Sequence, residues 1–555
     1  MGLIPRDARA GSGSQMRLTS GPFPISALGF FGLSLAIILG WWAWLGATVA
    51  LPPSPLTAGE KLQCVSYAPF RGRQTPWMGV DVTAAQIDED LSRLKNVTDC
   101  IRTYSIDHGL DQIPAIAGRH GLKVIQGLWL SSRPDLSRIQ INGAIDLARR
   151  HPDIIQAIVV GNEVLLRGEM SAAQLLATIR EVKAAVPTMP VTYADVWEFW
   201  LRNRDLAAAV DFVTVHILPY WEDEPIAVDK AVPHLNDIRK RVIAAFPGKD
   251  ILIGETGWPS AGRMREGALP SPVNQGRYIS EVLALARAEN FRVNVIEAFD
   301  QPWKRGQEGT VGGHWGLYDD PSREPKFNWG AGVSDHPYWP WQAAGGIVLA
   351  LLVFGAAASA GAHRRDDLSV WAGVGVIATV AGCLAGWAVA KAPLESLGLG
   401  GWLRSGAWVF VALLAPLAAG AAMTRGERPA NFAQVLAGAG RIGVSPLSLA
   451  LGGLLIALTA LAVHAAMGLT FDPRYRDFPF AALTAAAVPF MVLSLFGEKQ
   501  VGIRPRAETV AAVTLALAAL YIVFNESFAN WTSVWFCAGL ALVTGILLRV
   551  RAAPG

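Results

Sequence analysis

Charged residues are scarce in this chain of 555 residues: Asp, Glu, Lys and Arg make up only 17% of it, whereas hydrophobic residues make up 52%. One soluble globule of this length is excluded, because its surface would need more charge. Cysteine is also rare, with four residues, and no Cys/His spacing resembles a metal site. We expect no metal ion, no cofactor and no nucleic-acid partner.

The apolar residues gather in long segments that approach the roughly 20 residues of a membrane-spanning helix. Eight spans are predicted, at 26–50, 342–362, 369–390, 403–423, 445–467, 479–496, 508–524 and 532–548. Most of the charge lies between the first two spans, so this is a membrane protein with one large water-exposed domain. The predicted parts are a cytoplasmic tail (1–25), an anchor helix (26–50), a Pro-rich linker (51–61), the soluble domain (62–335) and a seven-helix transmembrane domain (341–549).

The orientation follows from the excess of Lys and Arg in cytoplasmic loops. With the N-terminus inside, the short outer loops hold only four such residues, Lys391, Arg404, Arg474 and Arg476. The inner segments hold thirteen: Arg6, Arg9, Arg17, Arg364, Arg365, Arg425, Arg428, Arg441, Lys499, Arg504, Arg506, Arg549 and Arg551. Both termini are therefore predicted in the cytoplasm, with the soluble domain on the periplasmic or exterior side of the inner (cell) membrane.

The first apolar segment allows a second interpretation, a cleaved signal peptide. It is long for that role and lacks a clear A-x-A site before the linker, so an uncleaved anchor is favoured. Two cysteines, Cys64 and Cys100, fall on predicted neighbouring strands. In an oxidising compartment they would form a disulfide, and two buried free thiols remain the alternative.

Apolar, β-rich runs alternate with amphipathic stretches through the soluble domain. The predicted strands are 62–67, 100–104, 123–127, 155–161, 191–194, 212–217, 251–254 and 293–298, and the clearest helices are 83–95, 137–150, 171–186, 226–246 and 273–289. Eight strand–helix units over about 240 residues match a (β/α)8 (TIM) barrel. An open doubly wound sheet is the alternative, but no Gly-rich phosphate loop follows the first strand.

Two glutamates end strands of this pattern. Glu163 follows the fourth predicted strand within Gly161-Asn162-Glu163, and Glu255 ends the seventh before Thr256-Gly257-Trp258-Pro259. A barrel enzyme builds its active site at the C-terminal ends of its strands. A pair of carboxylates there suits cleavage of a glycosidic bond, in which one donates a proton and the other attacks or steers water.

Other strand ends carry polar or aromatic side chains, which suit a carbohydrate cleft because aromatic faces stack on sugar rings. They are Tyr67, Arg102, Tyr104, Trp129, Asp195, Trp197, His216, Tyr220, Trp221, Glu297, Asp300 and Trp303. Arg102 would hold the strand-seven carboxylate ionised, and Lys304 would pair with a cleft acid. His216 would bind a substrate hydroxyl or orient a glutamate, although a structural histidine fits equally, and any single Trp is more often core.

These residues resemble glycoside hydrolase family 17, the β-1,3-glucanase family. The matching segments are SYAPF (66–70), IRTYS (101–105), VVGNEV (159–164), IGETGWPS (253–260), EAFDQPWK (297–304) and HWGLYD (314–319). The resemblance implies that Glu163 is the acid/base and Glu255 the nucleophile. It implies that Asn162 binds the 2-hydroxyl in the −1 site and that Tyr67, Tyr104 and Tyr220 line it. The predicted substrate-binding set is Asn162, Tyr67, Arg102, Tyr104, His216, Tyr220, Trp258, Glu297 and Trp303.

The membrane half makes the chain more similar to bacterial membrane-bound relatives called β-(1,6)-glucan synthases. We expect a retaining transglycosylase that uses a β-1,3-glucan donor, with β-1,6 branches as one product. A β-1,3-glucanase is the alternative, and a non-catalytic glucan-binding or scaffold protein is less favoured because both glutamates are present. The expected partners are β-glucan, membrane lipid and a glucan synthase. Because the spans show little buried charge, the membrane half is expected to be an anchor or scaffold.

Overall fold

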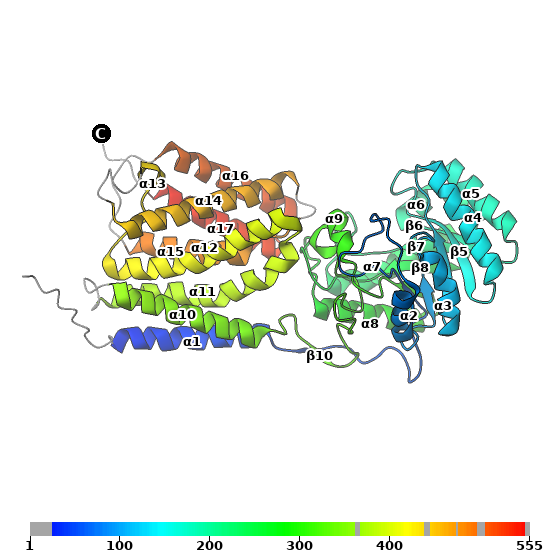
Figure 1. The fold of residues 1–555 in the computed structure, drawn as a ribbon, viewed down its shortest axis with the longest axis horizontal. Helices are drawn as coiled ribbons and strands as arrows, with labels where there is room; N and C mark the ends of the chain where they lie inside the picture. Colours follow the sequence, from blue (N-terminus) through cyan, green and yellow to red (C-terminus); the bar gives the residue numbers. More distant parts are fainter. Residues whose placement is uncertain (1–24, 361–366, 438–443, 473–475, 497–504, 550–555) are drawn as a thin grey trace, which may run out of the picture.

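The computed structural model describes residues 25–360, 367–437, 444–472, 476–496 and 505–549. A β/α barrel lies at one end of a bundle of long helices (Figure 1). The predicted cytoplasmic tail lies outside the described residues except for Ile25.

Eight parallel strands close into a barrel in sequence order, from β2 to β9. They are β2 (Cys64–Ser66), β3 (Cys100–Arg102), β4 (Lys123–Leu128), β5 (Ile155–Asn162), β6 (Val191–Val196), β7 (Val213–His216), β8 (Ile251–Thr256) and β9 (Arg292–Val295). The barrel predicted from the apolar runs is confirmed, and its closure excludes the open sheet. The runs are nearly continuous because helices cover the sheet, so that both faces of each strand are buried.

Amphipathic helices surround the barrel. They are α2 (Ala84–Leu94), α3 (Ile113–Arg119), α4 (Pro134–Arg150), α5 (Ala172–Ala185), α6 (Trp197–Arg202), α7 (Val228–Ala245) and α8 (Pro272–Ala288), with the single turn α9 (Arg305–Glu308) after β9. In α2, Thr83 caps the first turn, and Ile87, Leu91 and Leu94 form the buried stripe. The short helices α3 and α6 were not predicted, because seven and six residues hold too little periodicity.

Cys64 and Cys100 lie on the neighbouring strands β2 and β3 and form a disulfide, with their Cα atoms 4.4 Å apart. The sequence left this pair open between a disulfide and two thiols. The two other cysteines, Cys383 and Cys537, are free and buried in the helical bundle.

The bundle contains α1 (Ile25–Leu45), α10 (Trp339–Ala360), α11 (Leu368–Glu395), α12 (Gly398–Arg425), α13 (Phe432–Ala437), α14 (Pro446–Phe471), α15 (Phe480–Leu495), α16 (Arg506–Glu526) and α17 (Trp531–Leu548). Within the described residues, seven of these helices are long and apolar enough to cross a membrane. They indicate a multi-pass membrane protein. The predicted span at 479–496 corresponds to α15, whose 16 residues would reach about 24 Å, short of a hydrocarbon core of roughly 30 Å.

The barrel meets the bundle at one end of the helices (Figure 1). The chain segments that enter and leave the barrel, β1 (Val49–Ala50) and β10 (Gly332–Val333), pair as a two-stranded antiparallel sheet. The loop after β8 supplies Arg263, whose guanidinium donates to the Arg476 carbonyl at 2.7 Å and pairs with Glu526 at the end of α16. Loops at the C-terminal ends of the barrel strands, where barrel enzymes place their sites, therefore touch the bundle.

The variant Arg263→Met is expected to loosen this junction. Arg263 and Glu526 have only 5% and 9% of their side chains exposed, and removal of one partner from a buried pair costs about 3–5 kcal/mol. We expect a lower melting temperature of the full chain and faster hydrogen exchange in residues 256–271. The surface variant Arg138→Met is the matched control, because Arg138 and Glu181 are both about half exposed. A double variant Arg263→Met/Glu526→Gln as unstable as the sum of its single variants would contradict the pairing.

Candidate active site

The two predicted glutamates lie at the same end of the barrel. Glu255 is within β8, and Glu163 directly follows β5. The pairing register of β5 with β6 shifts between Val159 and Asn162, which marks a β-bulge. Gly161 and Glu163 both have positive φ, 84° and 53°. A non-glycine residue in this conformation costs energy and is often found at functional sites, so the end of β5 is bent to aim its side chains.

The carboxylates of Glu163 and Glu255 lie close to each other across the mouth of the barrel. A side-chain oxygen of each and a ring nitrogen of His216 all lie within 4.8 Å of one another. Retaining glycosidases hold their two carboxyl groups about 5–5.5 Å apart, whereas inverting enzymes need about 6.5–9.5 Å. The spacing favours retention of the anomeric configuration.

Glu255 is held by two side chains from β3 and the residues after it. Arg102 donates from Nη1 to Glu255 Oε1 at 2.9 Å, and the Tyr104 hydroxyl donates to the same oxygen at 2.9 Å. The second guanidinium nitrogen of Arg102 donates to Asn162 Oδ1 at 2.5 Å. Arg102 therefore fixes the position of Asn162, from β5, relative to Glu255, from β8.

Small polar residues that the sequence did not single out support this arrangement. Asn294 on β9 donates to the Ser66 hydroxyl at 2.8 Å and to the Gly254 carbonyl at 2.7 Å. The Ser66 hydroxyl in turn donates to the Tyr104 hydroxyl oxygen at 2.9 Å. A Cβ on Gly254 would lie 2.3 Å from Thr214 Cγ2, so only glycine allows β8 this approach to β7. These residues hold the backbone of β8 directly before Glu255.

His216 lies between the two glutamates. Its Nδ1 is 2.8 Å from Glu163 Oε1, and its Nε2 is 3.5 Å from Glu255 Oε1. The Nη2 atom of Arg102 approaches the same Nε2 at 3.4 Å. Of the three roles that the sequence left open for His216, these contacts fit the orientation of a glutamate.

These three side chains also have the geometry of a metal site. Their surroundings do not favour a cation, because the Arg102 guanidinium already occupies Glu255 Oε1 and fixed positive charge repels a metal ion. Lys304 adds a second positive charge that acts on Glu255. The donor set therefore fits acid/base and nucleophilic chemistry better than metal binding.

Electrostatics keep Glu255 ionised. Burial raises the pKa of this carboxyl, but the combined fields of His216, Arg102 and Lys304 outweigh burial and lower the pKa below its usual 4.5. The pKa of a neighbouring acid shifts in the opposite direction. Burial raises the pKa of Asp195 to about 6, where the Glu163 carboxylate also contributes. Carboxyl groups with lowered and with raised pKa values around one cleft are typical of a catalytic site.

The variant Arg102→Met is expected to move the acid limb of kcat/KM to higher pH by about 1–3 units. Glu255 must be ionised to attack, so activity falls as pH drops through its pKa. In the unaltered protein the pKa of Glu255 is lowered, and loss of Arg102 raises it. The pH profile of hydrolysis with an aryl β-glucoside measures the shift. Arg119→Met, on the surface beside Asp88, serves as the control, and an acid limb that stays in place would exclude Arg102 as the group that tunes Glu255.

The region after β9 carries an ion pair. Lys304 lies 2.7 Å from Glu297 Oε2, as the prediction of a pair with a cleft acid required. Burial raises the pKa of Glu297, against the effect of Lys304. Burial also raises the pKa of Glu308 to about 7; Lys304 opposes this shift, whereas the carboxylates of Glu297, Glu163 and Glu255 add to it. Residues 297–308 therefore lie within electrostatic reach of both glutamates.

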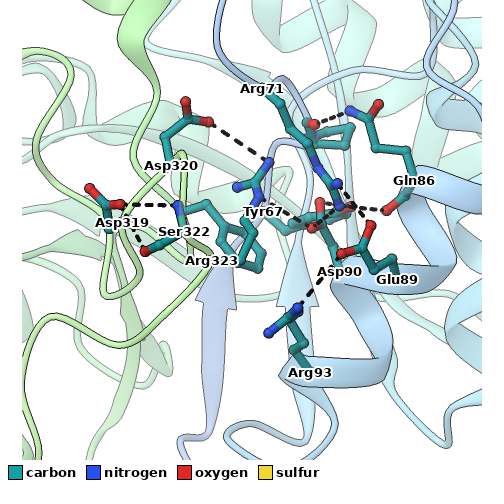
Figure 2. Close-up of polar contacts among 12 residues, drawn as sticks. Tyr67, Arg71, Gln86, Glu89, Asp90, Arg93, Asp319, Asp320, Ser322 and Arg323 are labelled. Carbon is teal, nitrogen blue, oxygen red and sulfur yellow. Dashed lines mark hydrogen bonds and ion pairs between the residues drawn. The ribbon is translucent and has the colours of Figure 1, made fainter.

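The polar atoms of three predicted site residues hydrogen-bond to groups other than the two glutamates and their partners. The Tyr67 hydroxyl donates to Asp90 of α2 at 3.0 Å, within a network that includes Arg71 and Arg323 (Figure 2). The Tyr220 hydroxyl donates to the Arg263 carbonyl at 2.7 Å, and the Trp258 indole donates to the Leu269 carbonyl at 2.9 Å. All three side chains are almost fully buried. They support the walls of the cleft and do not present these groups to a sugar.

Aromatic side chains around the mouth remain partly exposed. Trp303 donates from its indole to Gln301 Oε1 at 2.8 Å and packs edge-on against Phe70 and the exposed Trp77. Trp129 stacks with the Arg167 guanidinium at 4.1 Å. Partly exposed indoles beside paired carboxylates suit the stacking of sugar rings.

Comparison with known proteins points to the same chemistry. Residues 64–316 match the BtgE/BtgC glycoside hydrolase domain. A glucan 1,3-beta-glucosidase of Arthroderma benhamiae is 29% identical over 267 residues, covering 44% of this chain and 84% of that protein. A glucan 1,3-beta-glucosidase of Saccharomyces cerevisiae is 26% identical over 262 residues, covering 43% and 83%. The structure of a glycoside hydrolase family 17 beta-1,3-glucanosyltransferase from Rhizomucor miehei is 26% identical, covers 48% of this chain and 97% of that chain, and gives a TM-score of 0.43.

The matched region contains all eight barrel strands, both glutamates and Arg102. It ends before α10, so the helices from α10 onward lie outside it. The resemblance to family 17 drawn from the sequence motifs agrees, for the barrel, with the match to the BtgE/BtgC glycoside hydrolase domain and with the two glucan 1,3-beta-glucosidases. The chain is an enzyme whose barrel is a family-17-like glycoside hydrolase domain.

Proposed function

We propose that the chain is a retaining transglycosylase that cleaves β-1,3-glucan and transfers the released glycosyl unit to a second glucan, with β-1,6 branches as one product. The observation that carries the proposal is the pair of carboxylates within 4.8 Å at the ends of β5 and β8. The names of the two glucan 1,3-beta-glucosidases support the choice of β-1,3-glucan as donor.

In the first step Glu255 attacks the anomeric carbon, and Glu163 protonates the departing glycosidic oxygen. Arg102 and Tyr104 position the attacking carboxylate and keep it ionised. In the second step an acceptor hydroxyl attacks the glycosyl ester while Glu163 takes its proton. The Asn162 side chain, held by Arg102, would bind the 2-hydroxyl of the sugar that reacts.

The protein would act at the outer face of the inner membrane, with both termini in the cytoplasm. Two observations support this orientation. The Lys and Arg distribution favours it, and a disulfide between Cys64 and Cys100 fits an oxidising compartment. The barrel would then lie against the outer ends of the spans, where a glucan synthase partner and its emerging product are within reach.

Incubation of the full chain, purified in detergent, with laminarihexaose tests the function. Mass and linkage analysis of the products should show chains longer than six glucose units and new 1,6 linkages. Exclusively shorter products would contradict transfer and identify the alternative, a β-1,3-glucanase. No product of either kind would leave the non-catalytic glucan-binding or scaffold role.

A further inference from the structure

Two polar side chains of β6, Tyr193 and Asp195, are fully buried beside the active site and take no part in the two catalytic steps. The Tyr193 hydroxyl donates to Asp195 Oδ2. The other carboxylate oxygen, Oδ1, accepts from the Val196 amide at 2.8 Å. Buried polar groups are hydrogen-bonded in folded proteins, so the bonds of this pair indicate what it holds in place.

Tyr193 also contacts the backbone that follows Glu163. Its hydroxyl oxygen accepts from the Leu165 amide at 3.1 Å. A hydroxyl has one hydrogen to donate and two lone pairs that accept. Because Asp195 takes the hydrogen, the oxygen of Tyr193 presents its lone pairs to the Leu165 amide. The three residues therefore form a chain of hydrogen bonds that ends two residues after Glu163.

The backbone of Glu163 needs such support because its conformation is unfavourable. Its φ of 53° lies in the left-handed region, which costs energy for a residue with a Cβ. Two residues earlier, Gly161 has a φ of 84°, and a Cβ there would lie 2.6 Å from Val164 Cγ2. A segment with this geometry persists only where neighbouring contacts hold it.

Hydrogen bonds hold Glu163 from both sides. Its amide donates to the Ala194 carbonyl of β6 at 2.8 Å, and its carbonyl accepts from the Arg167 amide at 2.9 Å. Side chains add two more bonds. The Arg167 guanidinium donates to the Asn162 carbonyl on the N-terminal side, and Tyr193 accepts on the C-terminal side. Of these two side chains, Tyr193 is the one whose contribution can be removed by the loss of a single oxygen.

The direction of the Glu163 carboxylate depends on this backbone. Its Oε1 atom lies 2.8 Å from His216 Nδ1 at the mouth of the barrel. A return of φ to negative values would rotate the Cα–Cβ bond of Glu163 and carry the carboxylate away from His216 and from the glycosidic oxygen. A displacement of about 1 Å at a reacting group can cost about 10²-fold in rate.

We propose that Tyr193 and Asp195 are positioning residues for Glu163: they hold its left-handed backbone, so that its carboxyl group faces the glycosidic oxygen. This inference rests on the acid/base role of Glu163 in the proposed function. Tyr193 and Asp195 exchange no proton with the substrate and act through the main chain of residues 163–165. The acid at the end of β6 thereby has a role that is separate from the two catalytic carboxylates.

The test uses Tyr193→Phe in the full chain, purified in detergent. The variant is expected to lower kcat/KM for laminarihexaose about five- to tenfold, the effect of one lost hydrogen bond, mainly through kcat. With a dinitrophenyl β-glucoside, whose leaving group departs without protonation, kcat/KM should stay nearly unchanged. Tyr67→Phe is the matched control, because it removes an almost equally buried hydroxyl that is bound to the Asp90 carboxylate. The control should change kcat/KM for the two substrates in equal proportion.

A double variant separates positioning from a general loss of stability. In Glu163→Gln no acid remains to be positioned, so the addition of Tyr193→Phe should lower kcat/KM for laminarihexaose no further. A further loss as large as that of the single variant would overturn the inference. Equal losses on both substrates in Tyr193→Phe would overturn it as well.

Hydrogen exchange distinguishes this inference from the proposed function. The amides of residues 162–167 should exchange faster in Tyr193→Phe than in Tyr67→Phe, because the Leu165 amide loses its acceptor. Unchanged exchange in this segment would contradict the positioning role. Exclusively shorter products from the unaltered protein would end the proposal of transfer but not this one, because hydrolysis needs the same acid. If the unaltered protein is inactive, the proposed function fails, and the exchange comparison still decides whether Tyr193 holds the backbone of Glu163.

Discussion

Glu255→Gln is expected to lower turnover of laminari-oligosaccharides by at least about 10³-fold, because an amide cannot form the glycosyl ester. The substitution keeps the size of the side chain, so Arg102 and Tyr104 can still donate to the remaining oxygen. Initial rates with laminarihexaose measure the loss. Glu181→Gln, an exposed glutamate paired with Arg138, is the control and should be as active as the unaltered protein.

A chemical rescue assigns the role more firmly. In Glu255→Gly the space of the carboxylate is open, so azide can attack an activated aryl β-glucoside from the side that Glu255 occupied. One displacement inverts the anomeric centre, and the expected product is the α-glucosyl azide. Full activity of Glu255→Gln, or a β-configured azide product from Glu255→Gly, would show that another group is the nucleophile.

Much of the barrel could be predicted because a parallel sheet leaves a strong sequence signal. Residues such as Ile158, Val159 and Val160 are buried on both faces of β5, so the strand is a continuous apolar run. The ends of such runs also located the site. The C-terminal ends of all the strands meet at one mouth, so Glu163, Glu255 and Arg102 had to come together once the barrel was correct.

The directions of single side chains could not be predicted in the same way. Ser66 and Tyr67 are neighbours at the end of β2, and successive residues point to opposite faces. Ser66 therefore contacts Tyr104 inside the barrel, while Tyr67 reaches Asp90 on α2. A shift of one residue in the strand end would exchange these roles, and the composition of the run does not fix it.

No local sequence pattern indicates how the barrel packs against the bundle. Arg263 and Glu526 are 263 residues apart, and each looks like an ordinary loop or helix-end charge in the sequence. The same holds for Glu395, Arg404 and Asp477, which line one small cavity only when α11, α12 and the segment before α15 pack together. Contacts that depend on the packing of whole elements are available only from the structure.

Glu163→Gln is expected to lower activity on unactivated β-glucan by about 10²–10⁴-fold, the contribution of a general acid. Exposure distinguishes its role from that of Glu255. The Glu163 side chain is 24% exposed and the Glu255 side chain 6%, and only Glu255 carries the Arg102 ion pair. A carboxyl that must give a proton to one oxygen and take one from the next acceptor needs access to the cleft, whereas a nucleophile needs to stay ionised.

The leaving group of the substrate separates this variant from a misfolded one. A dinitrophenyl β-glucoside departs without protonation, so Glu163→Gln should form the glycosyl ester at a nearly unchanged rate and then accumulate it, because no base activates the acceptor. The measurement is a burst of dinitrophenolate equal to the enzyme concentration. Azide needs no general base, so in Glu163→Gly it should attack the ester and release the β-glucosyl azide, the opposite anomer from Glu255→Gly. The rate of glycosyl-ester formation decides the role, since in this first step only the unactivated substrate requires the proton that Glu163 supplies. Equal losses in that rate on activated and unactivated substrates would contradict the acid/base role.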